Sequence, residues 1–142
     1  MQTENRREYV LGAFLVRFAL GMLFFVMGLN KFIKGAADVS AQIAGMFKDS
    51  WLPAVMVAPY THVLPYMEVS VGVLLLLGLF RGVAVTLGSL LMLSLTFGMM
   101  VAGNGPIIAT NMTYVLMFAV ALFTSPWDRI KLDSLLFRRS SR

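Results

Sequence analysis

The sequence predicts an all-α membrane protein: an antiparallel four-helix transmembrane bundle with a short amphipathic segment between its first and second helices. Two observations carry this fold class. Hydrophobic residues make up 58% of the chain and charged residues only 13%, whereas soluble domains are about one quarter charged. Four apolar runs also approach or exceed the roughly 18 residues that mark a spanning helix. We therefore expect a single integral membrane domain over residues 1–142, without a separate soluble catalytic domain.

The boundaries of the four spans follow from where the apolar runs begin and end. The predicted spans cover about residues 9–33, 55–80, 82–101 and 106–123. Pro59 and Pro65 should bend the second span or delay its start. Pro106 suits the first turn of the fourth span. Because the turns after the second and third spans are short, neighbouring helices should run antiparallel.

The segment from Gly35 to Ala54 is too polar to cross a membrane. Asp38 can cap a short helix there. The apolar residues of that helix then share one face: Val39, Ile43, Met46 and Phe47. We interpret the segment as an amphipathic helix that lies on the bilayer surface or covers the bundle as a lid. A plain structured loop is the simpler alternative.

The distribution of basic residues predicts the orientation of the chain in the membrane. An even number of spans places both termini on one side, with eight lysines and arginines there against three on the other side. The eight are Arg6, Arg7, Arg81, Arg129, Lys131, Arg138, Arg139 and Arg142, and the three are Lys31, Lys34 and Lys48. We therefore expect both termini in the cytoplasm. Because these residues flank apolar segments, their expected partner is the lipid bilayer and not nucleic acid.

Two isolated charges lie inside the apolar runs. Arg17 is the only charge in the first run before Lys31, and Glu68 is the only charge in the second run. A lone charge in hydrocarbon costs roughly 2.5–3.5 kcal/mol on insertion scales, so we expect these two to meet. Helix rise places them about 7 Å apart along the membrane normal. We interpret Arg17 and Glu68 as a catalytic polar centre, paired directly or through water or a ligand; a purely structural pair is the alternative.

Other polar residues are candidates for binding a headgroup at the opposite end of the bundle. Asn111 and Tyr114 share a helix face, and Lys31 is expected near the same surface. Together they offer an amide, a phenol and an ammonium group. Ordinary hydrogen bonds between helices are an equal alternative for the first two. His62 is by default a solvated interface residue, and alternatively a proton donor to a bound ligand.

The scarcity of sulfur and imidazole ligands limits the redox chemistry of the chain. It has no cysteine and one histidine. A cysteine pair, an iron–sulfur cluster and a cysteine nucleophile are therefore excluded in this chain. A zinc site or a bis-histidine haem cannot be built from one histidine. We expect no metal or haem, and any redox role requires a bound organic cofactor or a partner protein.

Several stretches resemble the DoxX/DoxD family of small four-span bacterial membrane proteins. They are L-V-R-F-A-L-G at Leu15–Gly21, G-L-N-K-F at Gly28–Phe32, W-L-P-A at Trp51–Ala54, M-E-V-S-V-G-V-L-L-L-L-G-L-F-R at Met67–Arg81 and S-P-W-D-R-I-K-L-D at Ser125–Asp133. That family takes its name from subunits of thiosulfate:quinone oxidoreductase. The resemblance implies a bacterial inner-membrane subunit of a quinone-linked oxidoreductase system, with quinone as cofactor and a membrane or soluble redox protein as partner.

On this interpretation, a quinone headgroup is bound by residues near the outer surface, while the two isolated charges hold the core or carry protons. The expected headgroup ligands are Lys31, His62, Asn111 and Tyr114. A non-enzymatic accessory or assembly subunit is the first alternative. A small transporter is the second, and Arg17 disfavours it because a buried arginine holds Glu68 ionised and hinders proton exchange. The sequence leaves open whether the chain is itself an enzyme.

Overall fold

The computed structural model describes residues 2–127, and their side chains except at residues 2–6, Ala36 and Ala54. The helices are α1 (Gln2–Lys34), α2 (Ala36–Met46), α3 (Ala54–Leu77), α4 (Arg81–Val101) and α5 (Gly105–Thr124), followed by the 3-10 turn η1 (Ser125–Trp127). The predicted all-helical class is confirmed. In the described part of the chain, four segments are long and apolar enough to cross a membrane: Arg7–Lys34, Val55–Leu77, Arg81–Val101 and Gly105–Trp127. The chain is therefore a multi-pass membrane protein.

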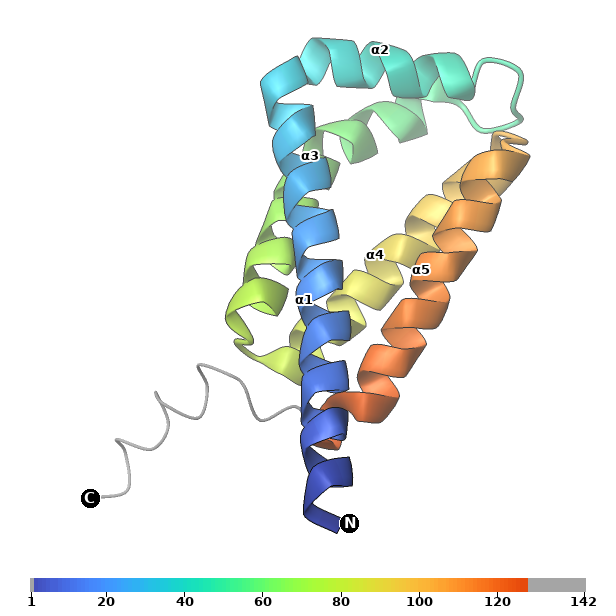
Figure 1. The fold of residues 1–142 in the computed structure, drawn as a ribbon. Helices are drawn as coiled ribbons and strands as arrows, with labels where there is room; N and C mark the ends of the chain where they lie inside the picture. The colour runs from blue at the N-terminus through green and yellow to red at the C-terminus, as the bar shows by residue number, and fades with distance from the viewer. Residues whose placement is uncertain (1, 128–142) are drawn as a thin grey trace.

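The four long helices form a bundle that α2 covers at one end (Figure 1). α1 packs mainly against α3, and α4 packs mainly against α5. Contacts between α3 and α4 and between α1 and α5 complete the bundle. α2 lies crosswise to α1 and packs against α3 and α1, at the end of the bundle opposite the N-terminus. The lid interpretation of this segment therefore agrees with the structure.

The α2 helix begins earlier than its sequence suggests. Its N-cap is Gly35, with φ 88° and ψ 147° and no side-chain capping bond. This backbone conformation is nearly restricted to glycine and lets the chain turn from α1 into α2. Asp38 therefore lies in the first turn, and its predicted role as the cap is wrong. The predicted apolar face is confirmed, because Val39 and Phe47 are buried against the bundle.

The α3 helix is bent and ends sooner than expected. Pro59 and Pro65 lie inside it, and Figure 1 shows a bend between a first part beneath α2 and a second part alongside α1. Each proline removes one backbone hydrogen bond and its ring clashes with an earlier carbonyl, which explains the bend. Gly78 then adopts a left-handed conformation with φ 66°, and the Leu79 N–H bonds to the Leu74 carbonyl at 3.1 Å. This glycine cap ends the helix at Leu77 instead of Phe80.

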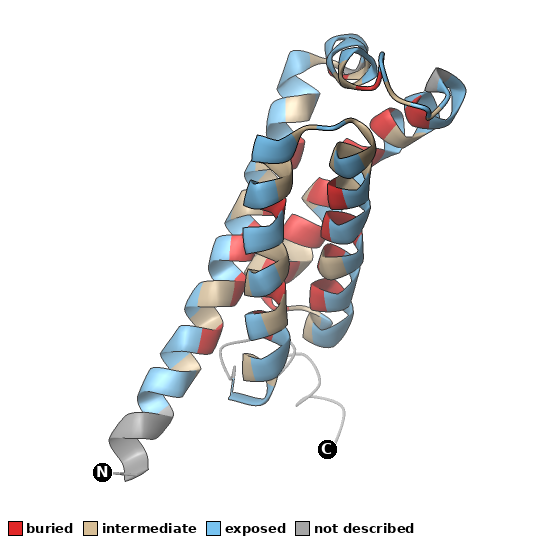
Figure 2. Ribbon diagram, turned by 90° about the vertical axis from the view of Figure 1, so that its right-hand side faces the viewer, coloured by how far each residue is buried: buried red, intermediate tan, exposed pale blue. Residues whose placement is uncertain are grey.

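Glycines fix the register of α1 against α3 along the helix axes. A Cβ added at Gly72 would come within 2.5 Å of the Phe25 backbone nitrogen. A Cβ at Gly28 would come within 2.9 Å of the Val69 nitrogen. The two backbones therefore touch at these levels, as small residues allow in membrane helices. The buried residues lie on the helix faces that meet, and exposed residues lie on the outer faces (Figure 2).

Candidate functional site

The charged centre of the bundle is an ion pair between Lys31 of α1 and Glu68 of α3. Glu68 is 0% exposed, and its Oε1 atom pairs with the Lys31 Nζ atom. Among the described residues, no group donates a hydrogen bond to the second carboxylate oxygen, Oε2. The Lys31 side chain is 19% exposed, so the pair links a buried carboxylate to a partly exposed lysine. A buried carboxylate with one unsatisfied oxygen costs free energy, and ionisable residues inside membrane spans are commonly functional.

The predicted direct pair between Arg17 and Glu68 is wrong. Glu68 lies against Gly28, because a Cβ at that glycine would be 3.0 Å from the Glu68 Cβ. Gly28 is eleven residues beyond Arg17 along α1, which corresponds to about 16 Å of helix rise. The separation of about 7 Å expected from the sequence was counted from Tyr9 and from Arg81, on the assumption that both lie at the same edge of the membrane. The structure instead packs Gly21 against Leu76, so the last turn of α3 lies near the level of Arg17.

Arg17 instead contacts the C-terminal end of α3. It is 2% exposed, and its Nη1 atom donates to the carbonyls of Leu75 and, at 3.4 Å, Leu76. The last four carbonyls of a helix lack partners within the helix and carry partial negative charge. A buried cation is therefore stabilised there. The guanidinium also lies 5.5 Å from the centre of the Phe14 ring.

Beneath α2, a cavity of about 320 Å³ opens beside Lys31; we call it the polar cavity. Polar side chains from α1, α2 and α5 line one part of it: Asn30, Lys31, Lys34, Gln42 and Asn111. Apolar side chains line the rest: Met27, Val39, Ile43, Met46, Leu64, Leu95, Met99 and Ile107. Its volume lies at the lower end of the range for small-molecule sites. The cavity therefore offers an amphiphilic ligand both hydrogen-bond donors and an apolar surface.

Two of the four predicted headgroup residues meet in the polar cavity, and two do not line it. Lys31 and Asn111 line it from α1 and α5. His62 is exposed on α3, where its Nδ1 atom lies 2.8 Å from the Ala58 carbonyl. Tyr114 is half-buried and packs against the apolar core of the bundle. The bound ligand remains a prediction for all four residues.

The sequence interpretation missed other residues of the polar cavity. Gln42 borders the apolar stripe of α2, and Asn30 and Lys34 flank Lys31 at the end of α1. The sequence showed the amphipathic pattern of α2, but it did not show which helices the apolar face packs against. Recognising that α2 covers the end of α1 would have pointed to all three residues.

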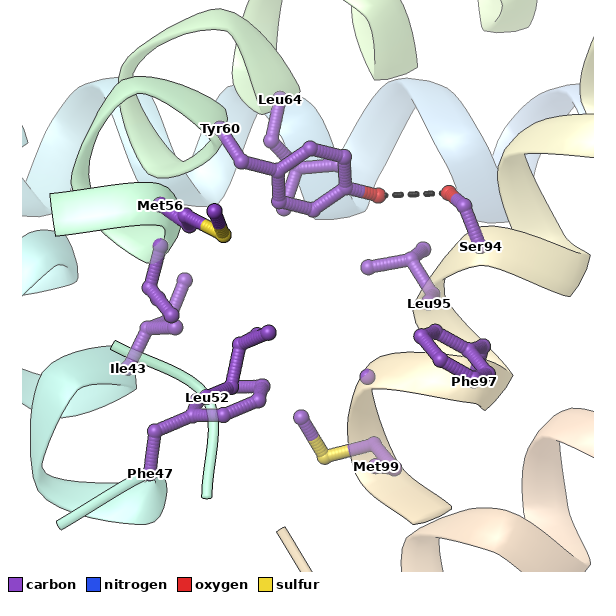
Figure 3. Close-up of a pocket in the computed structure, with 12 residues that line it drawn as sticks. Ile43, Phe47, Leu52, Met56, Tyr60, Leu64, Ser94, Leu95, Phe97 and Met99 are labelled. Carbon is purple, nitrogen blue, oxygen red and sulfur yellow. Dashed lines mark hydrogen bonds between the residues drawn. The ribbon is translucent and has the colours of Figure 1, made fainter. Parts of the chain in front are cut away.

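A second cavity of about 260 Å³ lies next to the first; we call it the apolar cavity (Figure 3). Its walls come from α2, the loop after it, the first part of α3, and α4. Four residues line both cavities: Ile43, Leu64, Leu95 and Met99. The space beneath α2 therefore has a polar part beside Lys31 and an apolar part beside α4.

Comparison with known proteins gives a family but no characterised relative. A family model described as "Methylamine utilisation protein MauE" matches residues 9–107, which is more than half of the chain. The match supports a membrane protein family, but not specifically the DoxX/DoxD family that the sequence resembles. No curated protein and no solved structure matches. The matched residues include both members of the Lys31–Glu68 pair and all of α2.

Proposed function

Because the chain belongs to the MauE family, we propose that it is an accessory membrane subunit of a redox enzyme system and that its polar cavity binds the headgroup of a membrane quinone. The description of the family names methylamine utilisation, and MauE is an accessory protein in a methylamine dehydrogenase system. A chain with no cysteine and one histidine offers few groups for electron transfer of its own. The electrons would pass through a bound organic cofactor or a partner protein.

The observation that carries the quinone proposal is the position of Lys31. Lys31 lines the polar cavity, and its ammonium group is paired with the buried carboxylate of Glu68. An unpaired lysine in this place would extend toward the membrane surface. Asn111 reaches the same cavity from another helix. A quinone ring has two carbonyl oxygens that accept hydrogen bonds, and Lys31 and Asn111 supply donors from two sides.

The proposed orientation puts α2 and the polar cavity on the outer side of a bacterial inner membrane, with both termini in the cytoplasm. The excess of basic residues on the terminal side supports it. Five of those residues, at positions 129–142, lie outside the described residues. In this orientation an extracytoplasmic redox partner would meet the α2 end of the bundle.

Purification in mild detergent, followed by mass spectrometry of bound quinone, tests the proposal. Wild-type protein should retain quinone. Per folded protein, Lys31→Gln should retain about 10- to 100-fold less, because hydrogen bonds to charged groups contribute about 1.5–3 kcal/mol. Lys48→Gln is the matched control. Lys48 is an exposed lysine at the same end of the molecule, and it lines neither the polar nor the apolar cavity. This variant should retain the wild-type amount.

Two results would contradict the quinone site. One is folded wild-type protein that carries no quinone and binds none when it is added. The other is equal retention by wild type and Lys31→Gln. If a partner protein copurifies while quinone is absent, the accessory role remains and the chain is an assembly subunit.

A further inference from the structure

We propose that the apolar cavity is the tail site of the same ligand, and that it takes the start of the isoprenoid chain of the quinone whose ring lies at Lys31. This inference rests on the proposed function and adds the path of the chain. Three features of the described residues support it. They are the two mutually bonded hydroxyls that are its only polar side chains, its position next to the polar cavity, and the position of its mouth.

The wall of the apolar cavity leaves no polar side chain free to hold water. Of the twelve lining residues, only Tyr60 and Ser94 carry polar side chains, and their oxygens lie 2.7 Å apart (Figure 3). Ser94 Oγ also donates to the Leu91 carbonyl at 2.8 Å, so Tyr60 donates to Ser94. A buried water needs two to four polar partners. The cavity is therefore expected to be dry, and dry cavities of this kind bind apolar molecules.

The apolar cavity adjoins the polar cavity and opens at the side of the bundle. Residues from three helices, among them Ile43, Leu64 and Leu95, line both cavities, so only these side chains lie between a molecule at Lys31 and the second cavity. Met56 and Phe97 also line the apolar cavity and are 65% and 58% exposed. They place its mouth on the lipid-facing surface between α3 and α4.

The size and the chemistry of this space fit one amphiphile. A volume of about 260 Å³ is many times the roughly 10–15 Å³ that one water molecule needs on the same kind of measure. That is enough for the first isoprene units, and the rest of the chain would leave through the lateral mouth into the lipid. A cationic donor at one end and a dry apolar cavity at the other match a quinone better than a free polar metabolite.

Photolabelling in lipid nanodiscs tests the tail site. The probe is a benzoquinone with a diazirine on the first part of its alkyl tail, and peptide mass spectrometry maps the adducts. In wild-type protein we expect adducts on Phe47, Leu52 and Met99. Gly98→Leu should lose them, because a Cβ at Gly98 already lies 3.4 Å from the Phe47 ring and the longer side chain enters the cavity. Gly82→Leu in the same helix is the control, since its Cβ meets no atom within 4 Å.

A second blocking variant and a tail-less ring separate the possible outcomes. Leu52→Trp fills the cavity from the loop and should also lose the adducts, so the test does not depend on Gly98→Leu folding. Adducts on outer residues such as Leu90 and Leu116, or adducts unchanged in both variants, would overturn the tail site. Failure of wild-type protein to bind a benzoquinone that has no alkyl tail would instead reject the headgroup site at Lys31. Adducts in the cavity with a diazirine phospholipid but not with the quinone would assign it to lipid and overturn the proposal.

Discussion

At the scale of single residues, Lys31 and Glu68 have unequal environments. Glu68 is fully buried, with one oxygen paired to Lys31 and the other without a hydrogen bond among the described residues. Lys31 borders the polar cavity and can turn toward it. Removing Lys31 should therefore destabilise the fold more than removing the Glu68 carboxylate. Without Lys31 the buried carboxylate has no other partner, whereas Lys31 without Glu68 can turn toward the polar cavity.

We predict a difference between the two single variants of this pair. Lys31→Met should destabilise the fold by about 3–5 kcal/mol, because it leaves an uncompensated buried carboxylate. Glu68→Gln should cost less, since Lys31 can move its ammonium into the cavity. The double variant should be more stable than the sum of the single effects predicts, by about 1–3 kcal/mol. Equilibrium unfolding in mixed micelles measures all four proteins, and strict additivity would contradict the coupling.

Arg17 has a different role from Glu68, although both are lone charges in apolar runs. Its guanidinium donates to carbonyls in the last turn of α3. It therefore ties the end of one helix to the middle of another. The catalytic role that the sequence predicts for Arg17 and Glu68 together stays a prediction, and the structure places the two residues in separate sites.

At the scale of elements, the contact between α1 and α3 determines which residues meet. Gly72 and Gly28 let the two backbones touch at two levels. Membrane helices gain little from the hydrophobic effect when they associate, so close van der Waals packing is a main source of stability. The same contact sets the level of Glu68 beside Lys31.

A methyl group at Gly72 should separate these two helices. Its Cβ would lie 2.5 Å from the Phe25 nitrogen, a backbone atom that can move only if α1 shifts. We expect Gly72→Ala to destabilise the protein by about 1–3 kcal/mol, as overpacking does in cores. Gly12→Ala is the control within α1, because its Cβ meets nothing within 4 Å. It should be neutral or stabilise by up to about 1 kcal/mol through helix propensity. Equal effects in thermal unfolding would contradict close packing at Gly72.

At the scale of the whole molecule, the two ends of the bundle differ in construction. One end is covered by α2, with the two cavities beneath it (Figure 1). At the other end, Tyr9 stacks on Trp127 with ring centres 5.6 Å apart, and Arg81 donates to Ser125 at 2.6 Å. The proposed ligand and partner sites therefore lie at the α2 end.

The predicted orientation can be measured with single cysteines, because the chain has none of its own. In intact cells, a membrane-impermeant maleimide should label Lys48→Cys after α2 and leave Gly82→Cys, at the opposite end, unlabelled until the membrane is opened. The reason is the excess of lysine and arginine on the side of the termini. The reverse labelling pattern would place α2 in the cytoplasm and move the proposed partner to that side.

The sequence by itself determined the helical class, the four spans and the amphipathic face of α2. These features depend on the length and periodicity of apolar runs, which are local properties. The positions of Pro59, Pro65 and Pro106 within or at the start of helices were predictable for the same reason.

Only the tertiary structure decided which groups meet. Glu68 pairs with Lys31 and not with Arg17 because Gly28 and Gly72 set the register of α1 against α3. Lys31 and Asn111 share a cavity with Gln42 because α2 folds back over the bundle. Periodicity gives the face of a helix but neither its depth nor its neighbour, since both depend on contacts between residues that are far apart in the chain.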